Sequence, residues 1–322
     1  MEYIGNKHRE QEYRVKRLIV IMLIITMACN VYSVGYCKTL NKEVAENNTG
    51  KDKRKKNDIK ASYETIYIGK RGNKVVTSHN ADKKIYPAST VKILTVIVML
   101  DKIKEKKLTG EEYIKVTDKV LKTVDYGSHM AYIGKDKQFR YNDLLKLVLV
   151  NSAADAVKVL EKSLFGNQKN LVKAMNSKAK EIGMSKSHFD NGIGLDIGNG
   201  YTKTYSTAHD MCLLGAFSYK YKFIRDTAKL KRCTVIAKGN KQHITVRSTN
   251  KFYYTEGYNK KKFVIIGTKT GYTNAAGSTL IATAKDKKGN IIVGAVYNVP
   301  KDEKVYTDMR IALEAAFSKI NF

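Results

Sequence analysis

The sequence predicts an α/β protein of the α+β kind, in which one antiparallel sheet is built from both ends of the folded region and is flanked by helices. Strand patterns lie near both ends, over residues 62–78 and 263–299. Between them, residues 142–183 follow a helical pattern, and apolar residues at helical spacing over 305–320 predict a closing helix. One sheet with an inserted helical lobe is the most economical assembly of these elements.

The first 37 residues are typical of an export signal. A basic start is followed, from Leu18 to Ala28, by an almost unbroken apolar stretch, which is the secretory pattern. Counted to Cys37, the apolar stretch has about 20 residues, enough to span a bilayer if it is not cleaved. The basic flank would keep that end cytoplasmic. We therefore expect residues 1–37 to be a signal peptide or an N-terminal membrane anchor, and the remainder to be exported.

The charge describes a strongly basic protein. The chain has 59 basic and 30 acidic residues, a net charge of +29. Residues 38–60 hold eight basic and four acidic residues without apolar periodicity, so they predict a solvated linker. The charge fits nucleic acid, anionic lipid or wall polymers, and a lysine-rich surface without a partner explains it equally well. Export, and the absence of zinc-finger or RNA-binding motifs, lead us to expect no nucleic-acid partner.

The folded region begins with a hairpin and a buried helix. Residues 62–69 and 74–78 alternate as strands around a turn at 71–73. Residues 90–103 are apolar on nearly every face, so they predict a central, buried helix, and Pro87 lies just before its start. The later strands are expected at three places: 263–266, 279–284 and 291–299.

Ser89 and Lys92 form the first candidate catalytic pair, in the sequence Ser-Thr-Val-Lys. Residues three apart share a helix face, and Ser89 would lie near the positive end of the helix dipole. Lys92 is the only charged residue between Ser89 and Asp101. Burial among apolar neighbours would lower its pKa and leave a neutral amine that accepts the serine proton. The ordinary alternative is an N-cap serine beside a lysine that reaches solvent.

Lys269, Thr270 and Gly271 form the second candidate site, at the end of the strand that begins at Phe263. Glycine has no side chain, so an extended ligand could lie along this strand edge. Lys269 would offer positive charge, and Thr270 a hydroxyl, to an anionic group. If Lys269 lies near Lys92, we expect its charge to lower the pKa of Lys92 further.

Ser152 lies in an apolar helical segment and completes an ordered set of three motifs. The order S-x-x-K, serine, K-T-G resembles that of the penicillin-interactive serine enzymes. The segment 86–95 resembles the nucleophile segment of the serine-type D-alanyl-D-alanine carboxypeptidases, the low-molecular-weight penicillin-binding proteins. The resemblance covers 62–320 and includes these further stretches: 143–156, 175–184, 189–196, 205–210, 248–250 and 267–277.

The resemblance implies a penicillin-binding/β-lactamase-like transpeptidase fold, with residues 61–322 as a D,D-carboxypeptidase catalytic domain. Ser89 would attack the carbonyl between two D-alanines and form an acyl-enzyme. Lys92 would be the base, and Ser152 would pass a proton to the leaving amine. Penicillins would acylate Ser89 by mimicking the dipeptide.

The resemblance also implies how the substrate is held. Lys269 and Thr270 would bind the terminal carboxylate beside Gly271. The backbone N–H groups of Ser89 and Tyr272 would form the oxyanion hole. The expected partner is a peptidoglycan stem peptide that ends in D-Ala-D-Ala, with β-lactams as inhibitors. We expect no cofactor, no metal and a monomer. We also expect membrane contact only through the N-terminal segment, because the residues after Gly271 suffice only for two strands and the closing helix.

One residue departs from the family pattern. The second motif usually reads S-x-N, but here Ser152 is followed by two alanines, Ala153 and Ala154. The family's asparagine amide contacts the lysine and the substrate's peptide bond, and alanine has neither donor nor acceptor. Losing one positioned hydrogen bond can cost about 2–4 kcal/mol. We therefore expect reduced activity, a neighbour that fills the role, or a specialised substrate.

Two alternative functions remain. Ala154 favours a catalytically impaired homologue that binds peptidoglycan. A class A-like β-lactamase would need a deacylating glutamate in an E-x-x-L-N context, which the sequence lacks between Ser152 and Lys269.

Other chemically suggestive residues do not make a site. Ser206, His209 and Asp210 lie too close together in sequence to form a proton relay. Cys212 and Cys233 could pair outside the cell, and two buried thiols are the alternative.

Overall fold

The computed structural model describes residues 59–69, 72–195, 203–254, 262–300 and 304–320. Residues 54–322 form one compact unit. The predicted leader, 1–37, and nearly all of the predicted linker, 38–60, lie outside the described residues. Among the described helices, none is both long enough and apolar enough to cross a membrane.

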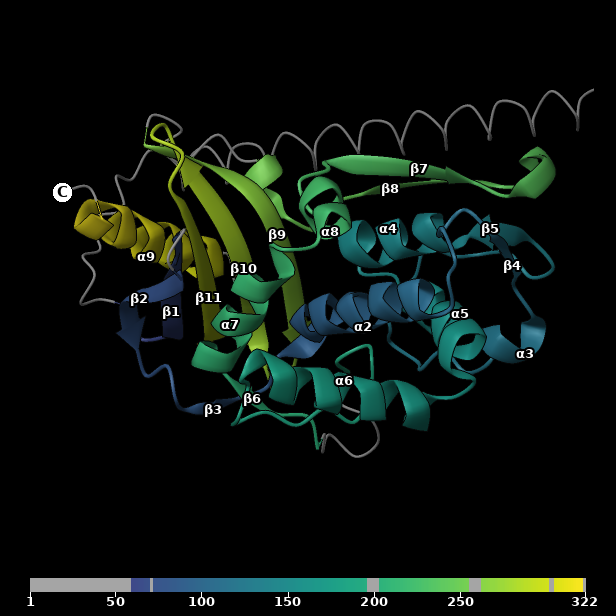
Figure 1. The fold of residues 1–322 in the computed structure, drawn as a ribbon, viewed down its shortest axis with the longest axis horizontal. Coiled ribbons are helices and arrows are strands. Elements are labelled where there is room, and N and C mark those ends of the chain that lie inside the picture. Colours follow the sequence, from purple (N-terminus) through teal and green to yellow (C-terminus); the bar gives the residue numbers. More distant parts are fainter. Residues whose placement is uncertain (1–58, 70–71, 196–202, 255–261, 301–303, 321–322) are drawn as a thin grey trace, which may run out of the picture. The chain divides into compact units, whose positions relative to one another are not determined.

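A five-stranded antiparallel sheet unites the two ends of the folded region, as the sequence predicted (Figure 1). Its strand order is β2-β1-β11-β10-β9, so the N-terminal hairpin lies beside the last strand and β9 is an edge strand. Five strands make up the sheet: β1 (Ser62–Gly69), β2 (Gly72–His79), β9 (Phe263–Thr273), β10 (Gly277–Asp286) and β11 (Ile291–Val299). The antiparallel sheet with flanking helices confirms the predicted fold class.

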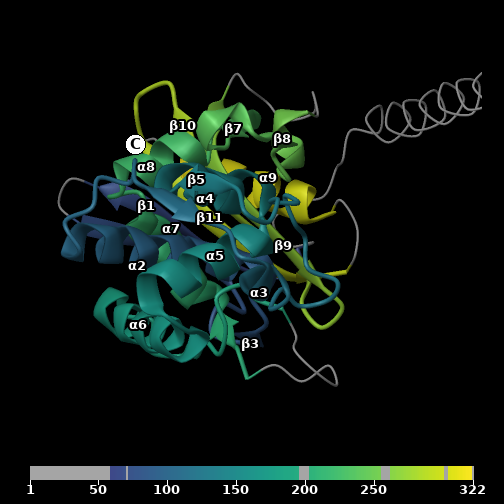
Figure 2. The same cartoon turned by 90° about the vertical axis from the view of Figure 1, so that its right-hand side faces the viewer.

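The predicted central helix is α2 (Lys92–Glu105), which is buried and follows the 3₁₀ turn η2 (Ala88–Val91). The predicted helical lobe consists of three helices: α4 (Tyr141–Asn151), α5 (Ala154–Phe165) and α6 (Gln168–Ile182). Figures 1 and 2 show these helices gathered around α2. The predicted closing helix is α9 (Lys304–Ile320). Three further helices were not predicted: α3 (Asp118–Leu121), α7 (Ala208–Ser218) and α8 (Lys222–Thr227).

Two apolar cores hold these layers together. One core joins α2 and the helical lobe to one face of the sheet through α7, and Leu94, Ile97 and Met99 of α2 are buried in it. The other core lies between the opposite sheet face and α9, where Phe263 stacks on Phe317. Burial of each such side chain contributes about 1.5–3 kcal/mol. The helix α2, which begins at Lys92, is therefore fixed within the first core, and the second core holds α9 to the opposite face of the sheet.

Several short elements were not predicted. The hairpin β7 (Arg232–Ile236) and β8 (His243–Arg247) runs alongside α4 (Figure 1). The 3₁₀ turns η3 (Lys238–Asn240) and η4 (Lys251–Tyr253) flank β8. Further two-stranded pairs join β3 (Lys84–Ile85) to β6 (Ser206–Thr207) and β4 (Tyr113–Lys115) to β5 (Gln138–Arg140).

The two cysteines of the folded region are unpaired. Cys212 and Cys233 are both free and buried. Burial raises the pKa of each thiol, so neither is a ready nucleophile. Of the two sequence alternatives, buried thiols are the one observed, and the disulfide is wrong.

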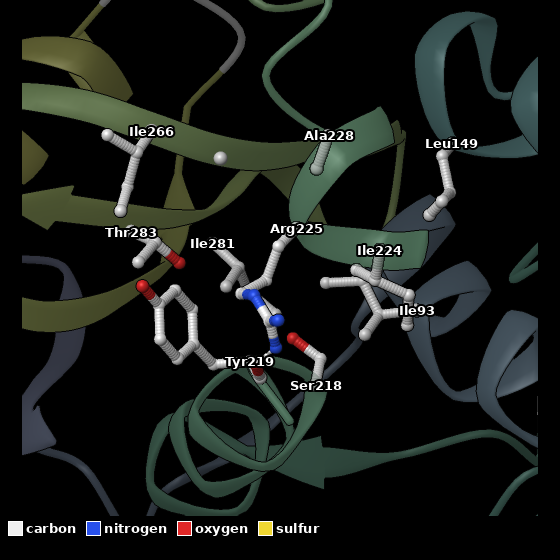
Figure 3. A pocket seen from close by; sticks show the side chains of 11 residues that line it. Ile93, Leu149, Ser218, Tyr219, Ile224, Arg225, Ala228, Ile266, Ile281 and Thr283 are labelled. Carbon is white, nitrogen blue, oxygen red and sulfur yellow. Dashed lines mark hydrogen bonds between the residues drawn. The ribbon is translucent and has the colours of Figure 1, made fainter. Parts of the chain in front are cut away.

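A small apolar pocket lies where α2, α4 and α8 meet the sheet (Figure 3). Ile93, Leu149 and Ile224 line it. Two of its polar side chains have partners within the protein: Arg225 donates to the Tyr219 carbonyl oxygen, and the Ser218 hydroxyl donates to the Gly215 carbonyl oxygen. The pocket is therefore a packing feature of the helical lobe.

Asp155, at the start of α5, fixes the backbone of residues 131–133. Its carboxylate is buried and accepts the backbone N–H groups of Ala131 and Ile133, each at 3.1 Å, and that of Ala156 at 2.9 Å. A carboxylate at a helix N-terminus also interacts favourably with the helix dipole. Asp155 therefore joins the segment 129–133 to the helical lobe.

Replacing Asp155 with alanine should destabilise the fold, because three backbone donors lose a charged acceptor in a buried position. We expect the free energy of unfolding to fall by about 3 kcal/mol, measured by urea denaturation. Asp82→Ala is the control, because the Asp82 side chain forms an exposed ion pair with Lys186, and this change should alter stability little. A loss below about 1 kcal/mol for Asp155→Ala would contradict this role.

Candidate active site

Ser89 lies in the 3₁₀ turn that leads into α2, and Lys92 is the first residue of that helix. The Lys92 ammonium donates to Ser89 Oγ at 2.8 Å, so the structure brings the pair together on one face. Ala88 precedes Ser89 with a φ of 47°, in the left-handed region that non-glycine residues seldom adopt. Such strain is typical of residues at functional sites.

Lys92 is buried, with 2% of its surface exposed. Besides Ser89 Oγ, its Nζ donates to the Ile193 carbonyl oxygen at 2.9 Å and to Ser152 Oγ at 3.2 Å. Burial lowers the pKa of Lys92 to about 7, although the charge of Asp155 acts in the opposite direction. A substantial fraction of Lys92 is therefore a neutral amine near neutral pH, beside a half-buried serine hydroxyl.

Ser152 lies at the break between α4 and α5. Its φ of 64° and ψ of 26° place it in the left-handed region, which ends α4. The side chain is buried, and its Oγ accepts from Lys92 Nζ at 3.2 Å and from Lys269 Nζ at 3.1 Å. A single hydroxyl therefore links the lysine of the first motif to that of the third.

Lys269 reaches the site from β9 and is 1% exposed. In addition to Ser152 Oγ, its ammonium donates to the Thr270 carbonyl oxygen at 2.7 Å. Burial lowers the pKa of Lys269 well below its ordinary value, and the charge of Lys92 lowers it further. The sequence analysis expected the charge of Lys269 to lower the pKa of Lys92. The structure shows the reverse: the charge of Lys92 lowers the pKa of Lys269, and burial alone lowers the pKa of Lys92.

Gly271 lets β9 approach Ser89. A Cβ on Gly271 would lie 2.5 Å from Thr279 Oγ1 and 2.8 Å from the backbone nitrogen of Ser89. A real side chain cannot be accommodated there, so the glycine brings the strand edge against Ser89. Thr270 Oγ1 shares a 2.6 Å hydrogen bond with Thr249 Oγ1, and the Tyr272 side chain is exposed.

A cleft of about 490 Å³ opens over these groups. Ser89, Ser152, Thr270, Gly271 and Tyr272 line it, so five of the seven predicted site residues share one cavity. The other two, Lys92 and Lys269, are buried and reach Ser152 Oγ from beneath it. The remaining lining residues are His129, Thr249, Lys251, Ser278, Thr279, Val305 and Tyr306.

The family resemblance included residues 189–196, but the sequence analysis did not predict that this segment supports Ser89 and Lys92. The Ile193 carbonyl oxygen accepts from both side chains, at 3.4 Å from Ser89 Oγ and 2.9 Å from Lys92 Nζ. Asn191 is fully buried, and its Oδ1 accepts the N–H groups of Ile193 and Gly194. The only signal in the sequence is the turn-forming run Asp190-Asn191-Gly192.

His129 is the other residue that sequence reasoning missed. It is exposed, lies in the segment between α3 and β5, and lines the cleft. Its position depends on contacts with α5, more than twenty residues later in the chain, so no local pattern marks it.

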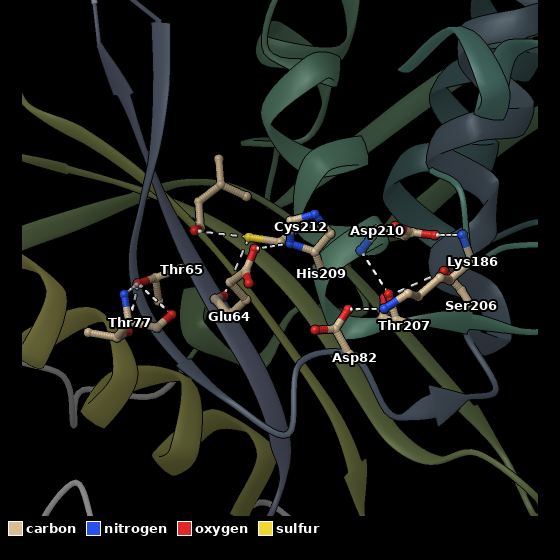
Figure 4. Close-up of polar contacts among 11 residues, drawn as sticks. Glu64, Thr65, Thr77, Asp82, Lys186, Ser206, Thr207, His209, Asp210 and Cys212 are labelled. Carbon is tan, nitrogen blue, oxygen red and sulfur yellow. Dashed lines mark hydrogen bonds and ion pairs between the residues drawn. The ribbon is translucent and has the colours of Figure 1, made fainter. Parts of the chain in front are cut away.

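Ser206, His209 and Asp210 do not form a relay, as the sequence predicted (Figure 4). Ser206 Oγ bonds to Ser187 Oγ at 2.7 Å, and His209 Nδ1 lies 2.8 Å from Glu64 Oε1. Asp210 accepts from the Lys186 backbone at 2.8 Å. These contacts hold α7 to β1 and to the turn after α6. Across the residues that the structure describes, no cluster of His, Cys, Asp or Glu has the composition to hold a metal ion.

The arrangement can support nucleophilic catalysis without a histidine base. A neutral Lys92 amine at 2.8 Å can accept the Ser89 proton. Ser152 can pass a proton between the lysine and a leaving group in the cleft. Lys269 and Thr270 offer a cation and a hydroxyl to an anionic ligand along the β9 edge.

Comparison with known sequences identifies relatives. The sequence model of a family described as D-alanyl-D-alanine carboxypeptidase matches residues 50–300. The D-alanyl-D-alanine carboxypeptidase DacF of Bacillus subtilis is 27% identical over 261 residues, which cover 79% of this chain and 61% of DacF. The D-alanyl-D-alanine endopeptidase of Escherichia coli is 29% identical over 221 residues, which cover 69% of this chain and 66% of the relative. This chain thus spans less than two thirds of the length of these relatives.

Solved structures share the fold. The Streptomyces K15 DD-transpeptidase has a TM-score of 0.69 at 22% identity, over 80% of this chain and 96% of that one. The D-alanyl-D-alanine carboxypeptidase of Mycobacterium tuberculosis H37Rv has a TM-score of 0.67 at 22% identity, over 81% and 91%. These likenesses confirm the fold that the resemblance implied. Because the family match spans well over half of the sequence, this chain belongs to the D-alanyl-D-alanine carboxypeptidase family.

Proposed function

We propose that this protein is a serine D,D-carboxypeptidase that removes the terminal D-alanine from peptidoglycan stem peptides and is acylated by penicillins. The observation that carries the proposal is the convergence of Lys92 and Lys269 on the Ser152 hydroxyl beside Ser89. Family membership supports the same activity.

The acylation step follows from these contacts. The neutral Lys92 amine takes the proton of Ser89 Oγ, which attacks the carbonyl carbon between the two D-alanines. The negative oxygen of the tetrahedral intermediate accepts the backbone N–H groups of Ser89 and Tyr272. When the C–N bond breaks, the proton passes from Lys92 through Ser152 to the amine of the departing D-alanine. Water then hydrolyses the ester and restores the Ser89 hydroxyl.

Lys269 and Thr270 hold the terminal carboxylate of the substrate. In the free site, burial and the charge of Lys92 lower the pKa of Lys269. A bound carboxylate favours the protonated ammonium again, so the substrate supplies the charge partner. Gly271 leaves the strand edge open for the peptide backbone.

Two alternative functions would give different experimental results. Ala154 in place of the family's asparagine favours an impaired enzyme that is acylated without turnover. A β-lactamase-like activity is less well supported, because no carboxylate lines the cleft among the described residues.

For the cellular setting, we propose that the enzyme is exported and acts on the wall. The basic, apolar pattern of residues 1–37 supports a signal peptide or anchor. A monomer suffices for the mechanism, because each proposed catalytic residue comes from one chain.

The proposed activity is tested by D-alanine release from a pentapeptide that ends in D-Ala-D-Ala. The wild type should release D-alanine, and Ser89→Ala should reduce release at least about a thousandfold, because no other group supplies the nucleophile. Ser206→Ala, which removes a structural hydroxyl away from the cleft, is the matched control. Penicillin labelling without D-alanine release would instead support the impaired alternative.

The rate of acylation should depend on the protonation of Lys92. Because the reactive form is the neutral amine and the pKa is about 7, the rate constant for fluorescent-penicillin labelling should fall about tenfold per unit below pH 7. Above pH 7 it should level off. Lys92→Arg should be nearly inactive from pH 6 to 9, because a guanidinium stays protonated.

The rate constant of fluorescent-penicillin labelling is measured from samples quenched at set times, in buffers from pH 5.5 to 8.5. The folded state of the protein is checked at each pH. A labelling rate that is constant across this range in the folded protein would contradict Lys92 as the base.

A further inference from the structure

The cleft lacks a polar group at the third position of the second motif. Ala154 is 1% exposed and offers only a methyl group where the family has an amide. Its backbone N–H is used within the fold, since it donates to the His129 carbonyl oxygen at 2.8 Å. The residue that lies against this position is therefore His129, from a different segment of the chain.

His129 is held firmly at this place. Its carbonyl oxygen is bonded to Ala154, and the following residues Ala131 and Ile133 are bonded to the buried Asp155 carboxylate at 3.1 Å each. Two adjacent residues at the start of α5 thus fix the segment that carries the imidazole. The side chain lines the same cleft as Ser89 and Ser152.

The surroundings of His129 favour its neutral form. Burial lowers its pKa, and the positive charges of Lys92 and Lys269 lower it further, while Asn151 and Asp155 act weakly in the opposite direction. A neutral imidazole has one N–H donor and one nitrogen acceptor. One ring nitrogen interacts with the Asn151 side chain, so the other can offer the cleft one donor or acceptor, which alanine lacks.

We propose that His129 takes the place of the missing asparagine amide, contacting the peptide bond of the bound substrate and helping to position it against Ser89. The proposal rests on the carboxypeptidase function above. In this proposal the contact that the family's asparagine makes from the α5 position comes instead from His129, on the neighbouring segment.

The test removes the polar side chain at position 129 and restores an asparagine at position 154. His129→Ala should lower the second-order rate of fluorescent-penicillin labelling by about tenfold to a hundredfold, the loss of one positioned hydrogen bond. His129→Ala with Ala154→Asn should regain most of that rate, because the amide returns from α5. Ala154→Asn alone should gain little, since in this proposal His129 already supplies the polar contact. His243→Ala, an exposed histidine on β8, is the matched control.

Labelling, kcat and KM for D-alanine release, and the unfolding midpoint are measured on the same preparations. If His129→Ala lowers the unfolding midpoint, the same experiments use His129→Leu instead. Leucine fills similar space without a polar atom. A merely structural role would not be rescued by an amide on α5. The proposal is overturned if His129→Ala labels within twofold of the wild type, or if the double variant does not recover.

The outcomes separate this proposal from the proposed function. A wild type that labels and releases D-alanine, with His129 variants unaffected, overturns only the role of His129. A wild type that labels without release overturns the carboxypeptidase activity, while the labelling rates still decide the role of His129. A wild type that does neither overturns both.

Discussion

The burial of two lysine ammonium groups around one serine hydroxyl is the constraint on which the site depends. Lys92 and Lys269 are 2% and 1% exposed, and both donate to Ser152 Oγ. The charge of Asp155 acts on Lys92, but its oxygens are bonded to backbone N–H groups. Burying a charge without a close partner is unfavourable, so the environment favours the neutral amine. The same burial that opposes folding therefore gives Lys92 the neutral amine that its proposed role as base requires.

The rest of the fold holds this arrangement in place. The central helix α2 is enclosed by apolar residues of the lobe and sheet, so Lys92 cannot turn toward solvent. The left-handed conformation of Ser152 ends α4 and keeps its hydroxyl between the two lysines. Gly271 allows the edge strand β9 to approach the backbone of Ser89. Gly194, with a φ of 74°, carries the turn that presents the Ile193 carbonyl oxygen to Lys92.

Much of this could be predicted from the sequence, and the failures have physical reasons. Ser89 and Lys92 are three residues apart on a helix, so their contact follows from local geometry. The sheet from both termini followed from strand patterns. The meeting of Ser152 with Lys269 depends on the complete fold, and only the family resemblance indicated it. No local pattern marks His129, because long-range hydrogen bonds place its segment. The run 190–192 indicates a turn at Ile193, but its contact with Lys92 depends on the complete fold. The β7–β8 hairpin was missed because its strands are short.

The central claim is that Ser89 is the nucleophile, and mass mapping of the covalent adduct tests it most directly. The full chain is incubated with a penicillin near neutral pH, quenched with acid, digested, and its peptides are analysed by tandem mass spectrometry. The account predicts one stoichiometric adduct, on the peptide that contains Ser89 and localised to that residue. An adduct on Ser152 or another residue, or an unmodified Ser89 peptide in a fully folded protein, would contradict it.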